Sequence, residues 1–236
     1  MNVIIFGASS GIGEALAKLC VERGHKVAIT GRRLPKLKEI QLTDREKILI
    51  KQHDVRDISS LQTVFDELVQ QLGGLDMVIL SSGIGELNRE LMWEKELNTI
   101  NTNILGAANV LSQSYRFFRK QGYGHIVGIS SIAGMRRSGQ APAYSASKAF
   151  LSNFLESLWL KAKKNQENIV VTDIVPGFID TDMAKGDTFW MASTQKAAKQ
   201  IYEAIKKKKR RVYITKRWRL IAILLRTMPI QILRKF

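Results

Sequence analysis

Residues 2–13 read NVIIFGASSGIG, an apolar run followed at once by a turn with three glycines in seven positions. The run 2–6 has the length of a buried strand, and residues 14–23 repeat their apolar side chains with a helical period. Strand, glycine turn and helix in this order form a phosphate cradle, because backbone N–H groups can approach the ligand and the helix N-terminus presents positive potential. An ordinary strand–helix turn rich in small residues is the alternative, and three glycines in so short a stretch argue against it. The residues expected to contact the phosphates are Gly7, Ser9, Ser10, Gly11, Ile12 and Gly13.

A second informative stretch is Tyr144-Ser145-Ala146-Ser147-Lys148, which places a phenol and an ammonium group four residues apart. The segment has a helical pattern, so the two side chains share one face. A phenol titrates near pH ~10 in isolation, and a nearby cation favours the phenolate and lowers its pKa. The spacing alone also fits a solvated helical face. Ser131 adds a hydroxyl after the apolar run 126–129, where a parallel strand would point it into the ligand crevice of an α/β sheet.

Together, Gly7-x-x-x-Gly11-x-Gly13, Ser131 and Tyr144-x-x-x-Lys148 resemble the motifs of the short-chain dehydrogenase/reductase family. The resemblance runs from residue 1 to about residue 215. It implies an α/β fold, a Rossmann-type doubly wound parallel sheet of about seven strands with helices on both faces. We therefore expect an NADP-binding catalytic domain at 1–215 and a basic amphipathic extension at 216–236.

Further positions match the family's pattern. Asn103-x-x-Gly106 matches the helix Asn that holds a water in a proton relay to the lysine, and Asp54-Val55 matches the segment at the adenine ring. Leu80-Ser81-Ser82-Gly83 departs from the family's Asn-Asn-Ala-Gly, which mostly stabilises the sheet and flanks the cofactor, so we expect activity to survive. The segment from Pro176 matches the one that closes over the nicotinamide. The cofactor contacts implied by these matches are Asp54, Val55, Ser82, Gly83, Tyr144, Lys148, Pro176, Gly177, Ile179 and Thr181.

Composition agrees with this class. A chain of 236 residues with 45% hydrophobic content can bury one substantial core. Apolar strand-like runs alternate with helical patterns, which predicts a parallel sheet covered on both faces. The expected strands are 2–6, 26–30, 46–51, 76–80, 124–129, 168–175 and 211–215, and the expected helices are 11–23, 58–72, 99–120, 142–164 and 194–208.

The end of the second expected strand predicts the cofactor. Thr30-Gly31-Arg32-Arg33 lacks the acid that would accept the ribose 2′-OH of NAD and carries two guanidinium groups instead. A guanidinium binds phosphate through paired, charge-assisted hydrogen bonds. In the family an Arg directly after this strand marks NADP enzymes, and Arg32 occupies that place; Arg33 is either a second contact or a solvated residue at a helix start. Ser9 could add a hydroxyl contact, and NADP(H) is the expected cofactor.

The resemblance also implies the chemistry. Tyr144 would give a proton to the nascent alkoxide in reduction or take it in oxidation, and Ser131 would hold the substrate oxygen. Lys148 would lower the tyrosine pKa and contact the nicotinamide ribose, while Asn103 would orient the relay water. NADP enzymes in a reducing cytosol usually run as reductases, which favours reduction of a ketone or aldehyde. A homodimer or homotetramer is expected separately. A non-catalytic NADP-binding regulatory protein is the alternative, and the intact Ser131, Tyr144 and Lys148 argue against it.

The remaining chemistry-bearing residues indicate neither a disulfide framework nor a metal site. Cys20 is the single cysteine and fits a small buried apolar residue of a helix. Met1 leads directly into the first strand, which leaves no room for a signal peptide and favours the cytoplasm. The histidines and loop acids lack metal-ligand spacing; they are His25, His53, His125, Asp180, Asp182 and Asp187.

The C-terminal part is unusually basic. Residues 204–236 hold twelve Lys or Arg and no acid, so the rest of the chain contributes only +16 − 12 = +4. The longest apolar run there, 220–225, is far shorter than the ~20 residues that span a bilayer. Interleaved basic and apolar residues are typical of a segment in a membrane interface. Three interpretations stay open: attachment to anionic lipid, packing on the domain or on a partner subunit, and nucleic-acid binding, for which no recognised motif is present.

The substrate is the least determined part of the prediction. The segment 176–196 is expected to cover the substrate, and its apolar side chains, with Met135, fit a hydrophobic ligand or ordinary core packing equally well. Lipid-like ketones, including long-chain, steroid-type or polyprenyl-linked sugar carbonyls, are the first class. A 3-oxoacyl group on an acidic carrier protein is the second, because a basic surface could steer such a partner. The apolar residues meant here are Met183, Phe189, Trp190 and Met191.

Overall fold

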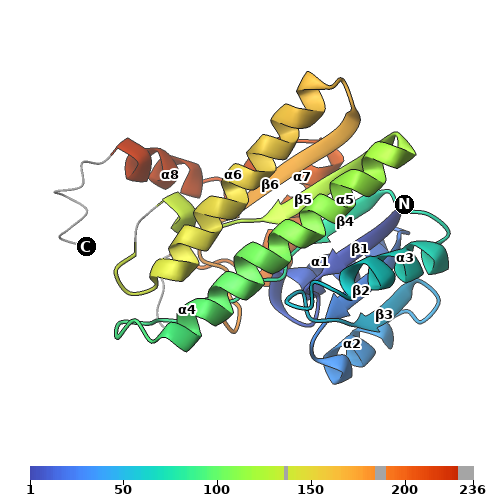
Figure 1. Ribbon diagram of the computed structural model, residues 1–236, viewed down its shortest axis with the longest axis horizontal. Coiled ribbons are helices and arrows are strands. Elements are labelled where there is room, and N and C mark those ends of the chain that lie inside the picture. Colours follow the sequence, from blue (N-terminus) through green and yellow to red (C-terminus); the bar gives the residue numbers. More distant parts are fainter. Residues whose placement is uncertain (136–137, 184–189, 228–236) are drawn as a thin grey trace.

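A computed structural model describes residues 1–135, 138–183 and 190–227 of the chain. Seven parallel strands form one sheet in the order β3-β2-β1-β4-β5-β6-β7 (Figure 1). The order reverses between β1 and β4, which creates the crevice at which such sheets bind ligands. The predicted doubly wound sheet of about seven strands is confirmed. The strands are β1 (Asn2–Phe6), β2 (Lys26–Gly31), β3 (Ile48–Gln52), β4 (Met77–Leu80), β5 (Tyr123–Ile129), β6 (Asn168–Pro176) and β7 (Arg211–Ile214).

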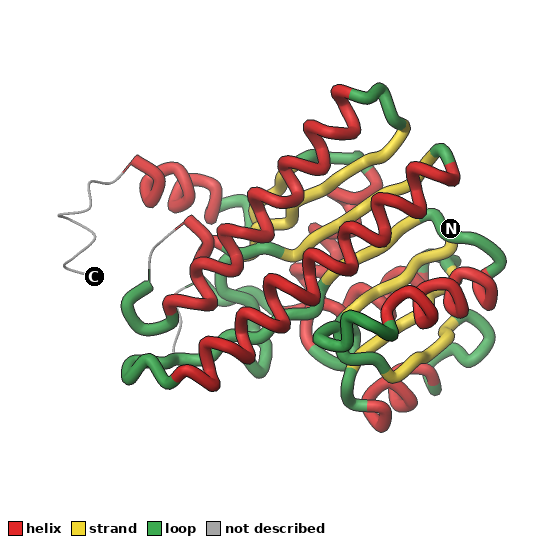
Figure 2. Tube along the Cα trace, viewed as in Figure 1, coloured by secondary structure: helices red, strands yellow, loops and turns green. Residues whose placement is uncertain are grey.

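Helices cover both faces of the sheet (Figure 2). One apolar core joins the sheet to α1, α2 and α7, and a second joins it to α3, α5 and α6. The α-helices are α1 (Gly11–Glu22), α2 (Leu34–Gln41), α3 (Leu61–Leu72), α4 (Trp93–Ile100), α5 (Ala107–Gln121), α6 (Pro142–Lys164), α7 (Thr194–Lys206) and α8 (Trp218–Thr227). A π-helical stretch, η1 (Asn101–Gly106), joins α4 to α5, and a 3₁₀ turn, η2 (Ile132–Met135), follows β5.

The first strand shows why its sequence is apolar from Val3 to Phe6. Successive strand side chains point to opposite faces. Val3 and Ile5 therefore enter the core under α1, whereas Ile4 and Phe6 enter the core under α5, and all four are fully buried. A strand covered on both faces reads as a continuous apolar run, as residues 3–6 do.

Two helical regions differ from the expectation. Helix α2 was not among the ranges named from the sequence, although one interpretation of Arg33 was a residue at a helix start. Pro35 in the first turn of α2 supplies the fixed φ that suits such a start. The expected helix 99–120 begins earlier, at Trp93, and changes to π-helical geometry at Asn101–Gly106. Gly106 packs there so closely on the loop after β3 that a Cβ would lie 2.6 Å from the Val55 carbonyl oxygen. A propensity pattern carries no signal for such a contact.

The first part of the C-terminal extension packs on the domain. Trp218 and Ala222 of α8 are 4% and 1% exposed and form a small apolar cluster with Ile132. Ile221 and Leu225 pack against the same cluster. The proposed boundary at 215/216 stays a prediction. Residues 228–236 of the extension lie outside the described part of the chain. Among the described helices, none is long and apolar enough to cross a bilayer.

Candidate active site

Three predicted catalytic side chains meet at the carboxyl ends of β4 and β5. Ser131 follows β5, and Tyr144 lies in the first turn of α6, with a side-chain hydrogen bond between the two residues. The Lys148 Nζ lies 5.8 Å from the centroid of the Tyr144 ring and donates a hydrogen bond to the Ile129 carbonyl oxygen at 3.1 Å. The spacings in the sequence therefore correspond to one site.

Asn103 joins this site from the π-helical stretch. Its amide exchanges two hydrogen bonds with the backbone of Ile84, accepting from N at 2.8 Å and donating to O at 2.7 Å. It also donates to the Ser147 hydroxyl at 3.0 Å, which ties the loop after β4 to α6. A Cβ on Gly83 would lie 3.2 Å from the Lys148 Nζ and 3.5 Å from the Asn103 Oδ1, so Gly83 lies between them. Sequence reasoning missed Ser147, for which the spacing gave no signal.

Burial controls the protonation of the pair, and this corrects one expectation. Desolvation raises the pKa of Tyr144 above its ordinary value, against the opposing hydrogen bond with Ser131. The expected lowering by Lys148 is therefore not what the structure gives. Burial lowers the pKa of Lys148 to about 8, against the opposing attraction of Asp173. Near neutral pH, Tyr144 is a protonated phenol that can give its proton away, and Lys148 is largely an ammonium group.

The glycine turn has the geometry of a phosphate cradle. Gly7 has a φ of +83°, and a Cβ there would lie 2.4 Å from the Ser82 Cα. A Cβ on Gly13 would lie 2.2 Å from the Gly7 carbonyl oxygen, so only glycine permits this approach of helix and strand. The Ser10 side chain does not cap α1, which leaves the N-terminal N–H groups of the helix without that competitor for a ligand. These residues fit a bound pyrophosphate.

Two side chains contact the glycine turn from different segments, Arg33 after β2 and Thr181 after β6. Arg33 Nη2 donates to the Ser10 Oγ at 2.6 Å and to the Ser9 Oγ at 3.2 Å. The three residues line a cavity of about 540 Å³ that also reaches Thr181. A Cβ on Gly11 would lie 3.2 Å from the Thr181 Cγ2, so the segment after β6 lies against the turn.

The two arginines after β2 have different surroundings. The Arg33 guanidinium is at the glycine turn. Arg32 accepts a hydrogen bond from Gln52 through its backbone carbonyl, and its charge acts on Asp54. Which guanidinium would bind a ribose 2′-phosphate stays a prediction, and the structure gives Arg33 the nearer hydroxyl partners.

Asp54 is held by a neighbour that sequence reasoning did not name. The Asp54 Oδ2 accepts from Arg56 Nη2 at 2.6 Å and from Nε at 2.9 Å, and the Oδ1 accepts from the same Nε at 3.1 Å. Burial opposes ionisation, but the hydrogen bonds from Arg56 keep the pKa of Asp54 below its usual value. This ion pair fixes the loop that leads into Val55, which is 8% exposed.

The segment after β6 packs against the C-terminal helix. A Cβ on Gly177 would lie 2.1 Å from the Trp218 Cε2, so the indole covers this glycine directly. The Trp218 ring makes edge-to-face contacts with Phe178 and Trp190, at centroid distances of 5.5 and 6.2 Å. The Arg217 guanidinium lies 4.9 Å from the centroid of the Trp190 ring. Helix α8 therefore packs on the segment after β6, which agrees with the interpretation of the basic extension as packing on the domain.

An apolar side chain of the expected substrate segment lies beside the Tyr144 phenol. A Cβ on Gly85 would lie 2.8 Å from the Tyr144 Cδ2 and 3.2 Å from the Met183 Sδ, so Met183 lies beside the tyrosine ring. Pro176 ends β6, and Ile179 is buried and forms a β-bridge with Ala192. The predicted Phe189 and Asp187 lie outside the described residues.

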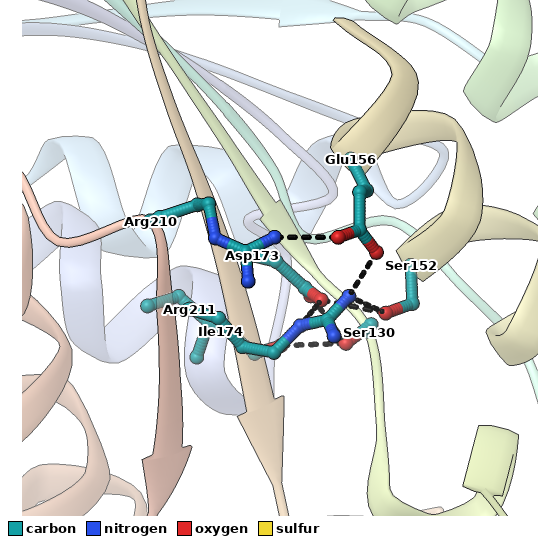
Figure 3. Close-up of polar contacts among 7 residues, drawn as sticks. All are labelled: Ser130, Ser152, Glu156, Asp173, Ile174, Arg210 and Arg211. Carbon is teal, nitrogen blue, oxygen red and sulfur yellow. Dashed lines mark hydrogen bonds and ion pairs between the residues drawn. The ribbon is translucent and has the colours of Figure 1, made fainter. Parts of the chain in front are cut away.

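One buried acid was also missed. Asp173, in the centre of β6, is 3% exposed and accepts hydrogen bonds from the hydroxyls of Ser130 and Ser152, both at 2.6 Å (Figure 3). Arg211 Nε donates to the same carboxylate at 2.9 Å. An acid inside the apolar run 168–175 was the available signal.

The histidines make ordinary hydrogen bonds. Each has a hydroxyl partner, of Tyr202 for His25, of Ser60 for His53 and of Thr172 for His125, and His25 also contacts the N-terminal amine. No group of three potential metal ligands occurs within residues 1–135, 138–183 and 190–227.

Comparisons with known proteins agree with this geometry. A family model described as short chain dehydrogenase matches residues 1–192. An uncharacterized oxidoreductase of Mycobacterium tuberculosis is 32% identical over 247 aligned residues, which cover 100% of this chain and 96% of the relative. A 3-oxoacyl-[acyl-carrier-protein] reductase of Bos taurus is 32% identical over 183 residues, 77% of this chain and 76% of that protein.

Among solved structures, a short-chain dehydrogenase from Sphingobium yanoikuyae in complex with NADPH superposes with a TM-score of 0.82. The match covers 93% of this chain and 91% of that one at 20% identity, which shows a shared fold. The family match over most of the chain carries the assignment. The chain is an oxidoreductase and belongs to the short-chain dehydrogenase family.

Proposed function

We propose that the protein reduces a ketone or aldehyde with NADPH, or oxidises the corresponding alcohol. The observation that carries the proposal is the meeting of Tyr144, Ser131 and Lys148 beside an apolar side chain, Met183, at the carboxyl end of the sheet. A buried, protonated phenol that is hydrogen-bonded to a serine is suited to give a proton to a developing alkoxide.

The residues present fit the cofactor. The pyrophosphate would lie on the glycine turn, and a ribose 2′-phosphate would bind Arg33 or Arg32 with the Ser9 hydroxyl nearby. Gly83 leaves space next to Lys148 and Asn103, as a ribose contact there requires. The Sphingobium relative was solved with NADPH, which supports the same choice here.

Each side chain of the site has a separate task. Bound NADPH would supply the hydride to the carbonyl carbon. The Ser131 hydroxyl holds the substrate oxygen, and the Tyr144 phenol donates the proton that this oxygen needs. A charged Lys148 stabilises the tyrosinate that this transfer leaves. Asn103 holds the loop after β4 against α6, so the phenol and the ammonium group keep their separation.

An apolar, lipid-like carbonyl compound is the substrate class we favour. Met183, Phe178 and Trp190 are 43%, 40% and 39% exposed, so apolar surface is available at this end of the molecule. A 3-oxoacyl group on a carrier protein is the alternative, favoured by the Bos taurus relative of that name. A non-catalytic NADP-binding role is the further alternative.

The C-terminal helix supports a second role, reversible attachment of a cytoplasmic protein to an anionic membrane. One side of α8 packs on the domain, while Leu220, Ile223 and Leu224 are 72%, 54% and 51% exposed. Lys216, Arg217 and Arg219 are exposed next to them, and each basic residue near anionic lipid contributes ~1 kcal/mol. Charge and apolar surface together favour lipid over nucleic acid.

Self-association is expected as well. Leu97 on α4, Leu105 on η1 and Leu160 on α6 are 38%, 51% and 55% exposed, and their burial would stabilise a homodimer or homotetramer. Light scattering during gel filtration tests this.

A carbonyl panel tests the main proposal. NADPH oxidation is followed against short-chain, steroid-type and long-chain ketones, a 3-oxoacyl carrier-protein conjugate, and lipid ketones in vesicles. Turnover of the lipid-like members supports the favoured class, turnover of the conjugate alone supports the alternative, and NADPH binding without turnover of any member supports the regulatory role.

A further inference from the structure

Helix α6 carries a line of polar side chains that extends beyond the catalytic pair. Tyr144, Lys148, Ser152 and Glu156 follow one another at intervals of four residues, so they lie on one face of the helix. Ser152 lies one turn from Lys148, and Glu156 lies about 12 Å along the axis from Lys148 at 1.5 Å per residue. The face turns toward β5, β6 and β7 (Figure 3).

The strands supply matching groups along this face. Lys148 donates to the Ile129 carbonyl on β5, and Ser152 donates to Asp173 on β6. Arg211 on β7 bonds Asp173 at 2.9 Å, and its Nη2 lies 3.3 Å from the Glu156 Oε2 (Figure 3). Asp173 therefore bonds Ser152, which lies one turn of α6 from Lys148, and pairs directly with Arg211.

Lys148 needs a counter-charge. The residue is 6% exposed, and a buried ammonium group is costly unless an anion compensates it. Among the described residues, Asp173 is the acid whose attraction opposes the lowering of the Lys148 pKa by burial. Asn103 and the Ile129 carbonyl, which also surround Lys148, carry no charge.

Other charged groups near α6 have separate partners. Glu96 on α4 accepts the Ala143 N–H at the start of α6. On β5, burial lowers the pKa of His125 to about 4, so its imidazole is neutral at neutral pH. Of the basic residues of α5, Arg116 bonds Gln113 and Arg119 bonds Glu167.

We propose that Asp173 is the counter-ion that keeps Lys148 charged while Tyr144 transfers its proton. Arg211 and the hydroxyls of Ser130 and Ser152 hold the Asp173 carboxylate in place. Asp173 touches neither the carbonyl substrate nor the cofactor in this account, so it is a positioning residue. The proposal rests on the proposed function only where it gives Lys148 a task in catalysis.

The direction of the effect follows from the two influences on Lys148. Burial lowers its pKa to about 8, and the attraction of Asp173 opposes that lowering. Without the carboxylate, the pKa of Lys148 falls further, by roughly one unit for the loss of a nearby opposite charge. Lys148 then loses its proton within the neutral range.

The experiment compares Asp173→Asn with Glu156→Gln, which changes the other acid on Arg211, two turns away. The Cε signal of ¹³C-labelled lysine, assigned with Lys148→Met, gives the titration of Lys148 in the cofactor-free protein without any substrate. We expect Asp173→Asn to move this titration down by roughly one unit and Glu156→Gln to leave it in place. On an accepted ketone, the fall of kcat with rising pH should move down by the same amount.

Because Asp173→Asn leaves the Arg211 guanidinium without its partner, Asp173→Asn/Arg211→Gln is measured too, with thermal unfolding as a check on folding. The proposal holds if Asp173→Asn shifts the Lys148 titration. If that variant does not fold, the double variant decides in the same way. An unshifted titration in a folded variant overturns it, as does an equal shift in Glu156→Gln. A shifted titration in a protein that reduces no carbonyl overturns the proposed function alone.

Discussion

Replacing Gly177 by Ala tests whether α8 is part of the catalytic domain. A Cβ at this position would lie 2.1, 2.2 and 2.3 Å from the Trp218 Cε2, Nε1 and Cδ2. Carbon atoms pack at about 3.5 Å or more, so the indole would have to move by about 1.4 Å. Its neighbours Phe178, Trp190 and Ile132 restrict that movement.

The expected cost is that of an overpacked contact, about 1–3 kcal/mol. For a domain of this size, about 2–4 °C of Tm corresponds to each kcal/mol, so Gly177→Ala should lower the Tm by roughly 2–12 °C. The main chain adds little to this cost, because Gly177 does not have a positive φ.

A double-mutant cycle separates this contact from any other effect of the substitution. Trp218→Ala alone should cost about 3 kcal/mol, the lower end for a buried aromatic, because its cluster is small. In that background Gly177→Ala should cost almost nothing, since the added methyl group takes space that the indole has left. Urea unfolding of the four proteins measures the coupling. The same loss in both backgrounds, or no loss in the first, would refute the packing of α8 on this segment.

Two further predictions concern binding. Alanine variants of Arg33 and Arg32 should weaken NADPH more than NADH, by roughly 1.5–3 kcal/mol for the guanidinium that binds the 2′-phosphate; equal losses for both cofactors in both variants would show that neither reads the phosphate. Leu220→Asp should reduce sedimentation with anionic vesicles and leave the Tm nearly unchanged, because the side chain is 72% exposed. Leu42→Asp, at a site 61% exposed beyond α2, is the matched control, and equal behaviour of the two variants would contradict membrane docking through α8.

Local patterns in the sequence were enough to predict the sheet and the meeting of Tyr144 with Lys148. Residues 3–6 are apolar because both faces of β1 are covered, and Tyr144 and Lys148 meet because helical spacing brings them together. Contacts between distant segments were not predictable in this way. The Gly177–Trp218 contact joins residues 41 positions apart, and the Asp173–Arg211 pair joins residues 38 apart.

The predicted direction of the Tyr144 pKa shift was wrong for a related reason. The i, i+4 argument included the charge of Lys148 but not the burial of the phenol, which depends on the packing of α6 against the loop at Gly85. Burial is the larger influence. Ser82, which belongs to the segment that departs from the family's Asn-Asn-Ala-Gly, lies next to Gly7, and the Ser82 Cα packs against the glycine turn.

Tyr144→Phe tests the central claim most directly, because it removes only the phenolic hydroxyl. The measurement pairs kcat, on a ketone that the wild-type protein reduces, with the Kd of NADPH from fluorescence titration. We expect kcat to fall by at least ~10³-fold, within the range by which proton transfer from a positioned side chain accelerates reactions, while NADPH binds as before. A variant that keeps most of the wild-type kcat would contradict the assignment of Tyr144 as the proton donor.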